Sequence, residues 1–161
     1  KTAEGTSWGA VYAQFFQNTS EIEQSQSGIT VKREVLVSSP SIPSTTSMTS
    51  TTSLKVGDRI KIRLTIECTR DLDFVQVVDR RAACMEPVNQ LSGYRNGCYI
   101  SPKDYATNYY YYGLSKGKHV VETEYYIDRA GTYESGTCTV QCAYAPEYRA
   151  TAPSVVLKVK E

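Results

Sequence analysis

The stretch that decides the fold of this chain is Leu54-Lys55-Val56-Gly57-Asp58-Arg59-Ile60-Lys61-Ile62-Arg63-Leu64-Thr65-Ile66-Glu67-Cys68. From position 60 onward, apolar residues alternate with charged or polar ones. A period of two places successive side chains on opposite sides of a β-strand. One side of this strand is therefore buried and the other meets water, which is typical of an antiparallel sheet.

Similar short strand patterns recur along the chain, separated by turn residues. In residues 29–37 one face carries Ile29, Val31, Val35 and Val37, and Arg33 interrupts that face. The other expected strands are 74–79, 105–112, 119–127, 137–144 and 155–160. Residues 80–104 and 146–153 contain prolines and read as irregular connections. This spacing predicts an all-β chain folded as an antiparallel immunoglobulin-like β-sandwich.

Three segments do not fit the strand pattern. In residues 6–17 the large apolar side chains match a helical stripe, although the same residues tolerate a strand. Residues 18–28 are polar and read as a linker. Residues 38–53 are rich in Ser and Thr with almost nothing apolar to bury, so we expect a mobile loop there.

The bulk composition excludes several classes of function. The chain has 161 residues, enough for about one domain, and its net charge is +1. A nucleic-acid-binding domain would carry a basic patch, so we expect no nucleic-acid partner. No apolar run approaches the ~18 residues that a membrane-spanning helix needs, so we expect no membrane span in this fragment.

Tyrosine is over-represented, with 13 copies against three Phe and one Trp. The run Tyr109-Tyr110-Tyr111-Tyr112 lies in an expected strand. A ligand platform is one interpretation, but a strand with one pair of rings inward and one pair outward explains the run more simply.

The five cysteines, Cys68, Cys84, Cys98, Cys138 and Cys142, do not have the spacing of a structural zinc site. Cys84 and Cys98 flank one connection and are a possible disulfide, and Cys84 with Cys142 is the alternative. Cys138 and Cys142 share one face of the strand 137–144 with Tyr144. They lie about 13 Å apart along that strand, too far for a disulfide.

No catalytic constellation is present in the sequence. His119 is the only histidine, and nucleophilic catalysis would need it beside a Ser or Cys and an orienting acid. Glu122 and Glu124 share one strand face but read as solvated side chains. We therefore expect no enzyme activity, no metal and no cofactor.

Five segments together give a resemblance to a known family. They are 54–58, 79–87, 114–118, Ala130-Gly131-Thr132-Tyr133 and Gln141-Cys142-Ala143-Tyr144-Ala145-Pro146-Glu147. In this order they resemble the C-terminal domain of bacterial alpha-2-macroglobulin family proteins, with Ala143 where that family often has Met. The segment 5–16 resembles the last strand of the preceding module, so we expect a strand there. The domain boundaries would then be 1–27 for that module's end and a linker, and 28–161 for the macroglobulin-like sandwich.

The resemblance implies a structural role. Family members are large chains of sandwich modules that trap proteases, many of them through an internal thioester with the pattern Cys-x-x-Gln. Here Cys84-Met85-Glu86-Pro87 lacks the glutamine, so no reactive residue is expected in this chain. The family-motif residues Gly131, Thr132, Tyr133, Tyr144, Pro146 and Glu147 would be structural.

The resemblance also implies partners and a location. The module would pack beside the thioester domain of the parent and shield its bond from water. It would meet a target protease only through the full-length protein, in the periplasm or at the cell surface. The alternative is a free-standing cell-surface adhesion or carbohydrate-binding β-sandwich that uses its tyrosines as a platform.

Overall fold

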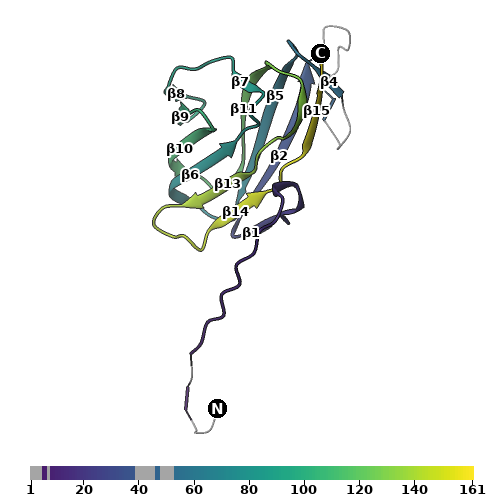
Figure 1. Ribbon diagram of the computed structural model, residues 1–161. Helices are drawn as coiled ribbons and strands as arrows, with labels where there is room; N and C mark the ends of the chain where they lie inside the picture. The colour runs from purple at the N-terminus through teal and green to yellow at the C-terminus, as the bar shows by residue number, and fades with distance from the viewer. Residues whose placement is uncertain (1–4, 7, 39–45, 48–52) are drawn as a thin grey trace.

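A computed structural model describes residues 5–6, 8–38, 46–47 and 53–161, and they form two facing β-sheets with a smaller third sheet at one side (Figure 1). The larger sheet has the strand order β1 (Ser25–Ser27), β14 (Arg149–Ala152), β13 (Cys138–Cys142), β6 (Leu72–Arg80), β10 (Ala106–Leu114), β9 (Cys98–Pro102) and β8 (Gly93–Arg95). The facing sheet has the order β3 (Thr46–Ser47), β2 (Ile29–Ser38), β5 (Arg59–Cys68), β11 (Gly117–Ile127) and β7 (Met85–Pro87).

The third sheet has the order β12 (Gly131–Glu134), β15 (Val156–Lys160) and β4 (Ser53–Lys55). Within the described residues, β15 and β4 pair in parallel and every other recorded strand pair is antiparallel. The antiparallel β-sandwich expected from the alternation is therefore confirmed.

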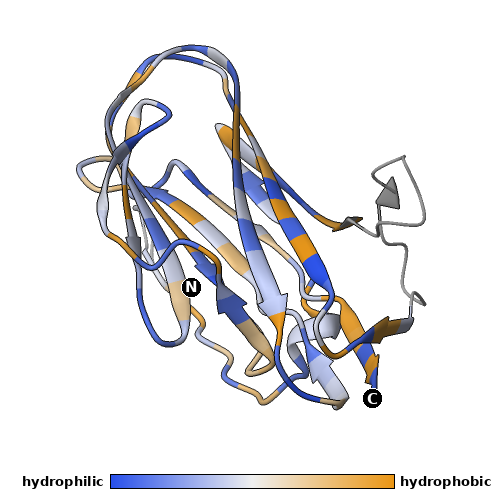
Figure 2. Cartoon of the chain, turned by 90° about the horizontal axis from the view of Figure 1, so that it is seen from above, coloured by the Kyte–Doolittle hydropathy of each residue, from blue (hydrophilic) through white to orange (hydrophobic). Residues whose placement is uncertain are grey.

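Side chains alternate between buried and accessible positions along β5, as the sequence predicted. Its apolar residues are buried, while Arg63 and Glu67 on the other side reach the surface. Figure 2 shows orange and blue alternating along the strands. The tyrosine run alternates in the same way, because Tyr109 and Tyr111 are buried whereas Tyr110 and Tyr112 are exposed. The core lies between the inner faces of the two larger sheets.

Several short strands lie where the sequence indicated loops. Residues 80–104 contain β7, β8 and β9, and residues 146–153 contain β14. The β8–β9 hairpin turns at Asn96-Gly97, where both residues have positive φ, as a tight two-residue hairpin requires. Strands of three to five residues give too few alternating positions to stand out from a turn-rich background.

The N-terminal segment does not form the expected strand in this chain. Residues 8–18 have neither strand nor helix structure, and they run away from the sandwich (Figure 1). Their large apolar side chains are almost fully exposed, with Trp8 at 94% and Phe16 at 106%. A strand needs a partner, and this segment pairs with none of the described strands.

The expected linker 18–28 is structured. A 3-10 helix, η1 (Thr19–Glu21), is followed by β1, which pairs with β14. The Ser20 hydroxyl donates to Glu134 at 2.9 Å, Thr19 also donates to Glu134, and the Ser154 amide donates to the Thr19 carbonyl at 3.3 Å. The point at which the N-terminal segment leaves the sandwich is therefore fixed to β12.

Two other observations complete the fold. Of the expected mobile loop 38–53, residues 39–45 and 48–52 lie outside the described residues, and β3 and the start of β4 fall within it. Among the described residues, no helix is long and apolar enough to cross a bilayer.

Candidate functional site

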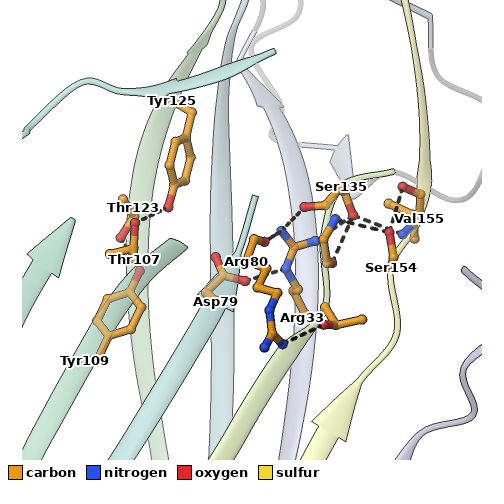
Figure 3. A network of polar contacts seen from close by, with 12 residues as sticks. Arg33, Asp79, Arg80, Thr107, Tyr109, Thr123, Tyr125, Ser135, Ser154 and Val155 are labelled. Carbon is orange, nitrogen blue, oxygen red and sulfur yellow. Dashed lines mark hydrogen bonds and ion pairs between the residues drawn. The ribbon is translucent and has the colours of Figure 1, made fainter. Parts of the chain in front are cut away.

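A buried polar network crosses the core between the two large sheets. Arg33 points inward from β2, and its Nε donates to Asp79 of β6 at 2.6 Å. Both side chains are essentially inaccessible to water, at 2% and 0% exposure. The same guanidinium donates to the Ser135 hydroxyl and carbonyl, each at 2.9 Å (Figure 3). Arg33 therefore joins both sheets and the β12–β13 connection.

Hydrogen bonds extend this network in one direction, and two further polar pairs lie elsewhere in the core. The Val155 amide donates to the Ser135 hydroxyl at 3.0 Å, and the Gly136 amide donates to the Ser154 hydroxyl at 3.2 Å. The two further pairs are Tyr–Thr hydroxyl pairs that link β10 to β11 in the core (Figure 3): Thr107 with Tyr125 at 2.8 Å and Tyr109 with Thr123 at 2.5 Å. These contacts satisfy most of the polar groups that the sandwich buries.

The electrostatics of the pair follow from its burial. Burial by itself would lower the pKa of Arg33, but the charge and the hydrogen bond of Asp79 hold that pKa above its usual value. Burial raises the pKa of Asp79 above its usual value, although the charge and the hydrogen bond of Arg33 oppose this rise. Among the described residues, the second carboxylate oxygen, Asp79 Oδ2, has no hydrogen-bond partner. The arrangement pairs two buried charges and offers no exposed group for chemistry, so its role is structural.

The predicted pair Glu122 and Glu124 lies on the outer face of β11 within a ladder of ion pairs. Glu122 contacts Arg63 at 2.6 Å and Lys61 at 3.0 Å, and Glu124 contacts Lys61 at 3.7 Å. The hydrogen bonds from Arg63 and Lys61 lower the pKa of Glu122. A general acid needs a raised pKa, so this environment does not suit Glu122 to that role.

An aromatic face covers the outer side of the larger sheet. We use this name for the six residues Phe74, Tyr94, Tyr99, Tyr110, Tyr112 and Tyr144. Phe74 packs against Tyr112 and Tyr144 with ring centroids 5.3 and 5.1 Å apart, and Tyr99 packs against Tyr94 at 5.2 Å. A hollow of about 350 Å³ lies between these two groups, with Ala143 and Gln76 also in its wall.

The aromatic face is unusually exposed for such large side chains. Tyr94, Tyr112 and Tyr144 are 69%, 71% and 80% accessible, and Phe74 is 43% accessible. Charged residues border it: Arg70, Asp71, Asp73 and Glu147 line the adjacent hollow beside Tyr144. An apolar centre with a polar rim is the usual anatomy of a protein–protein interface.

The family-motif residues occupy two separate places. Gly131, Thr132 and Tyr133 lie in β12, where the Tyr133 hydroxyl donates to the Ala130 carbonyl at 2.8 Å. Tyr144, Pro146 and Glu147 lie in the β13–β14 loop, residues 143–148. These two places are at opposite ends of β13. The sequence placed Tyr144 in this strand, on the same face as Cys138 and Cys142, but the strand ends at Cys142 and Tyr144 is exposed.

The five cysteines are free and buried in the described structure, so neither expected disulfide is formed. Cys98 lies level with Tyr111, four residues, or ~13 Å, along β10 from Thr107, which contacts Tyr125. Cys84 lies beyond Tyr125 in the opposite direction, next to β7. A disulfide needs α-carbons within about 7 Å. Cys142 lies at the same end of the sandwich as Cys98, so Cys142 is also too far from Cys84 for a disulfide.

No group of three or more His, Cys, Asp or Glu residues in the described ranges could hold a metal ion. His119, half-buried, makes its recorded contact with the Ser115 carbonyl at 2.7 Å. Two features stand out here, and the sequence indicated each of them only in part. Arg33 was visible as an interruption, but its partner lies 46 positions away. The aromatic face gathers residues from four strands and one loop.

Comparisons with known proteins agree with the observed fold. Residues 28–147 match the family described as the bacterial alpha-2-macroglobulin MG10 domain. A search of curated protein sequences found no match.

Solved structures resemble the chain at low sequence identity. The crystal structure of Salmonella alpha-2-macroglobulin reacted with methylamine aligns with a TM-score of 0.72 and 20% identity, over 87% of this chain and 10% of that one. The native conformation of E. coli alpha-2-macroglobulin aligns with a TM-score of 0.72 and 17% identity, over 88% and 10%.

A shorter E. coli structure, running from domain MG7 to the C-terminus, aligns with a TM-score of 0.71 and 17% identity, over 88% of this chain and 25% of that one. This chain therefore spans about a tenth of the length of the whole macroglobulins that it resembles. At these identities the structural likeness shows the fold, and the family rests on the match over residues 28–147. By that match, this chain belongs to the family of bacterial alpha-2-macroglobulin MG10 domains.

Proposed function

We propose that this chain is a non-catalytic structural module of an alpha-2-macroglobulin-like protease inhibitor, and that its aromatic face packs against the thioester domain of the parent protein. The observation that carries the proposal is the aromatic face itself. Soluble monomers seldom expose a large contiguous apolar patch, and Tyr and Phe are enriched where proteins meet. The face joins exposed rings, a hollow and a charged rim in one place.

The partner we propose is another domain of the same parent chain. The chain corresponds to about a tenth of the macroglobulins that it resembles, so a parent of that kind would place further domains around it. The rings of the aromatic face would then be buried as they are at other interfaces. The thioester domain is the partner that the family resemblance implies, and its bond would be shielded from water by this contact.

The N-terminal segment supports a second contact with the parent. Residues 5–17 expose Trp8, Val11, Tyr12, Phe15 and Phe16. We propose that this segment completes the preceding module, where these side chains would be buried. Deleting residues 1–17 should then leave the unfolding midpoint of the sandwich unchanged, because the segment leaves the body at η1. A clear loss of stability would show that it belongs to this domain.

The experiment for the main proposal uses the full-length parent protein. Hydrolysis of an internal thioester releases the cysteine thiolate, which a thiol reagent measures. Tyr112→Ser and Tyr144→Ser should speed this release severalfold, and Val120→Ser should not. Val120 is a matched control because it is also exposed but lies on the outer face of the other sheet. Equal rates in all variants, or a parent without Cys-x-x-Gln, would contradict the shielding role.

We propose protease inhibition and a cellular location for the whole parent protein, not for this chain alone. The proposal places the parent in the periplasm or at the cell surface, where it would meet a foreign protease. The purified parent should form a complex with an added protease, whereas this chain alone should not. Hydrolytic activity of this chain alone would contradict its non-catalytic role.

The alternative function is a free-standing carbohydrate-binding or adhesion domain. The specific observation in its favour is the hollow beside Tyr94, Tyr110 and Tyr112, since exposed rings also stack on sugars. A glycan array with this chain tests it directly. We expect no binding, and specific binding that is lost in Tyr112→Ser would favour the alternative.

A further inference from the structure

Phe74 has a backbone conformation that its side chain should avoid. It lies in β6, in the middle of the larger sheet, yet its φ is +54°. This left-handed region is unfavourable for bulky residues and open to glycine. Such outliers persist where the surroundings hold them, and they gather at functional sites. The left-handed backbone of Phe74 therefore points to a role beyond packing.

The conformation of Phe74 sets the start of the β13–β14 loop. Its carbonyl accepts a hydrogen bond from the Ala143 amide at 2.9 Å, one residue before Tyr144. Its ring meets the Tyr144 ring edge-on, with 5.1 Å between centroids and 86° between ring planes. The backbone and the ring of Phe74 thus hold the same short segment from two sides.

The ring of Phe74 also forms one wall of the hollow in the aromatic face. Tyr112 packs against it at 5.3 Å, and Ala143 contributes a small side chain to the wall. A hollow of about 350 Å³ bounded by rings leaves room for an apolar side chain from another protein domain. Phe74 therefore lies where the loop and the hollow meet.

We propose that Phe74 is a positioning residue that presents Tyr144 and the β13–β14 loop to the neighbouring domain of the parent chain, and that this domain inserts an apolar side chain into the hollow. The inference rests on the proposed function, because it assigns a residue to the contact proposed there. It predicts that the loop depends on the Phe74 ring for docking, although the sandwich does not depend on that ring for folding.

Phe74→Gly separates these two roles. Glycine accepts a φ of +54° without strain but removes the ring. If Phe74 acts in docking, the variant should keep or raise the unfolding midpoint of this chain while the loop no longer docks. Phe74→Tyr keeps the ring and should retain docking. Val120→Ala is the control, because Val120 lies on the outer face of the other sheet and alanine does not weaken the strand as glycine would.

The measurement is hydrogen exchange at the amides of residues 143–148, in this chain and in the full-length parent. In the wild-type parent the loop should exchange more slowly than in this chain alone. In Phe74→Gly that protection should fall by about thirtyfold, as for a lost interface hot spot. Phe74→Tyr and Val120→Ala should exchange like wild type.

The outcomes separate the two proposals. If the wild-type loop is no better protected in the parent than in this chain, the proposed packing surface is wrong. If the wild-type loop is protected and Phe74→Gly is protected equally, the packing surface stands and the positioning role of Phe74 is overturned. If Phe74→Gly unfolds this chain, Phe74 is a folding residue and the inference also fails.

Discussion

The Nε atom of Arg33 lies 2.6 Å from Oδ1 of Asp79, and this ion pair joins the two large sheets across the core. Both partners are withdrawn from water, so each would be left as a lone buried charge without the other. Removing one partner of a buried pair is far more damaging than replacing both, because desolvation is then uncompensated.

Arg33→Met should therefore destabilise the domain by about 3–5 kcal/mol, and Asp79→Leu should do the same. The double variant should recover much of this loss, but not all, because Arg33 also satisfies the Ser135 carbonyl. Urea unfolding of the two single variants and the double variant measures these changes in the free energy of unfolding. Lys61→Met, which removes a partly exposed partner of Glu122, is the control and should cost no more than ~1 kcal/mol. Single variants that cost as little as the control would show that the pair does not hold the sheets together.

The β12–β13 connection contains a glycine that the network requires. Gly136 has a φ of +87°, and a β-carbon there would lie 2.1 Å from the Arg80 carbonyl oxygen. Gly57 has a similar φ of +92° but open space around it. Gly57→Ala should cost about 1–2 kcal/mol from backbone strain alone, whereas Gly136→Ala should cost clearly more because the backbone must move. Thermal unfolding compares the two, and equal losses would contradict the close packing against Arg80.

The strand pattern could be predicted because alternation is a local property of the chain. The alternation in β5 and in Tyr109–Tyr112 was visible in consecutive residues. The short strands β7, β8, β9, β12 and β14 could not be predicted, because pairing with a neighbour defines them more than their own sequence does. The N-terminal segment was ambiguous for the same reason.

The candidate site was predicted only in part. The resemblance marked Tyr144, Pro146 and Glu147, which lie in the loop next to the aromatic face. It did not mark Phe74, whose left-handed conformation is a property of the folded backbone. The partner of Arg33 was also hidden, because the two residues meet only after the sheets face each other.

The pH dependence of stability should include a small contribution from Glu122. Arg63 and Lys61 lower the pKa of Glu122 below its ordinary value of 4.5 in the folded chain. This carboxylate therefore stabilises the fold at pH values above ~4.5, and the contribution is lost as the pH falls through the lowered pKa. Because the pairs are partly exposed, the contribution should be below ~1 kcal/mol.

Urea unfolding of wild type and Glu122→Gln between pH 7 and pH 3 measures this contribution. The two proteins should differ at neutral pH and converge in acid. Glu124→Gln is the matched control, since the contact of Glu124 with Lys61 is longer, at 3.7 Å. A difference that grows in acid would mean that the pKa of Glu122 is shifted in the opposite direction.

The five buried thiols should react slowly in the native chain. Burial raises the pKa of Cys68 to about 11 and that of Cys84 to about 11, so few thiolates are present at pH 8. A thiol reagent at pH 8 should label the native chain slowly and all five cysteines once the chain is denatured without reductant. Fewer than five labelled thiols in the denatured chain would reveal a disulfide that the described structure does not contain.

The most direct test of the packing proposal is a structure of the full-length parent protein by electron cryo-microscopy. In the native conformation, the thioester domain should cover the aromatic face, with Phe74, Tyr112 and Tyr144 buried and an apolar side chain in the hollow. A native structure in which these three rings remain as exposed as they are in this chain would contradict the proposed role of the module.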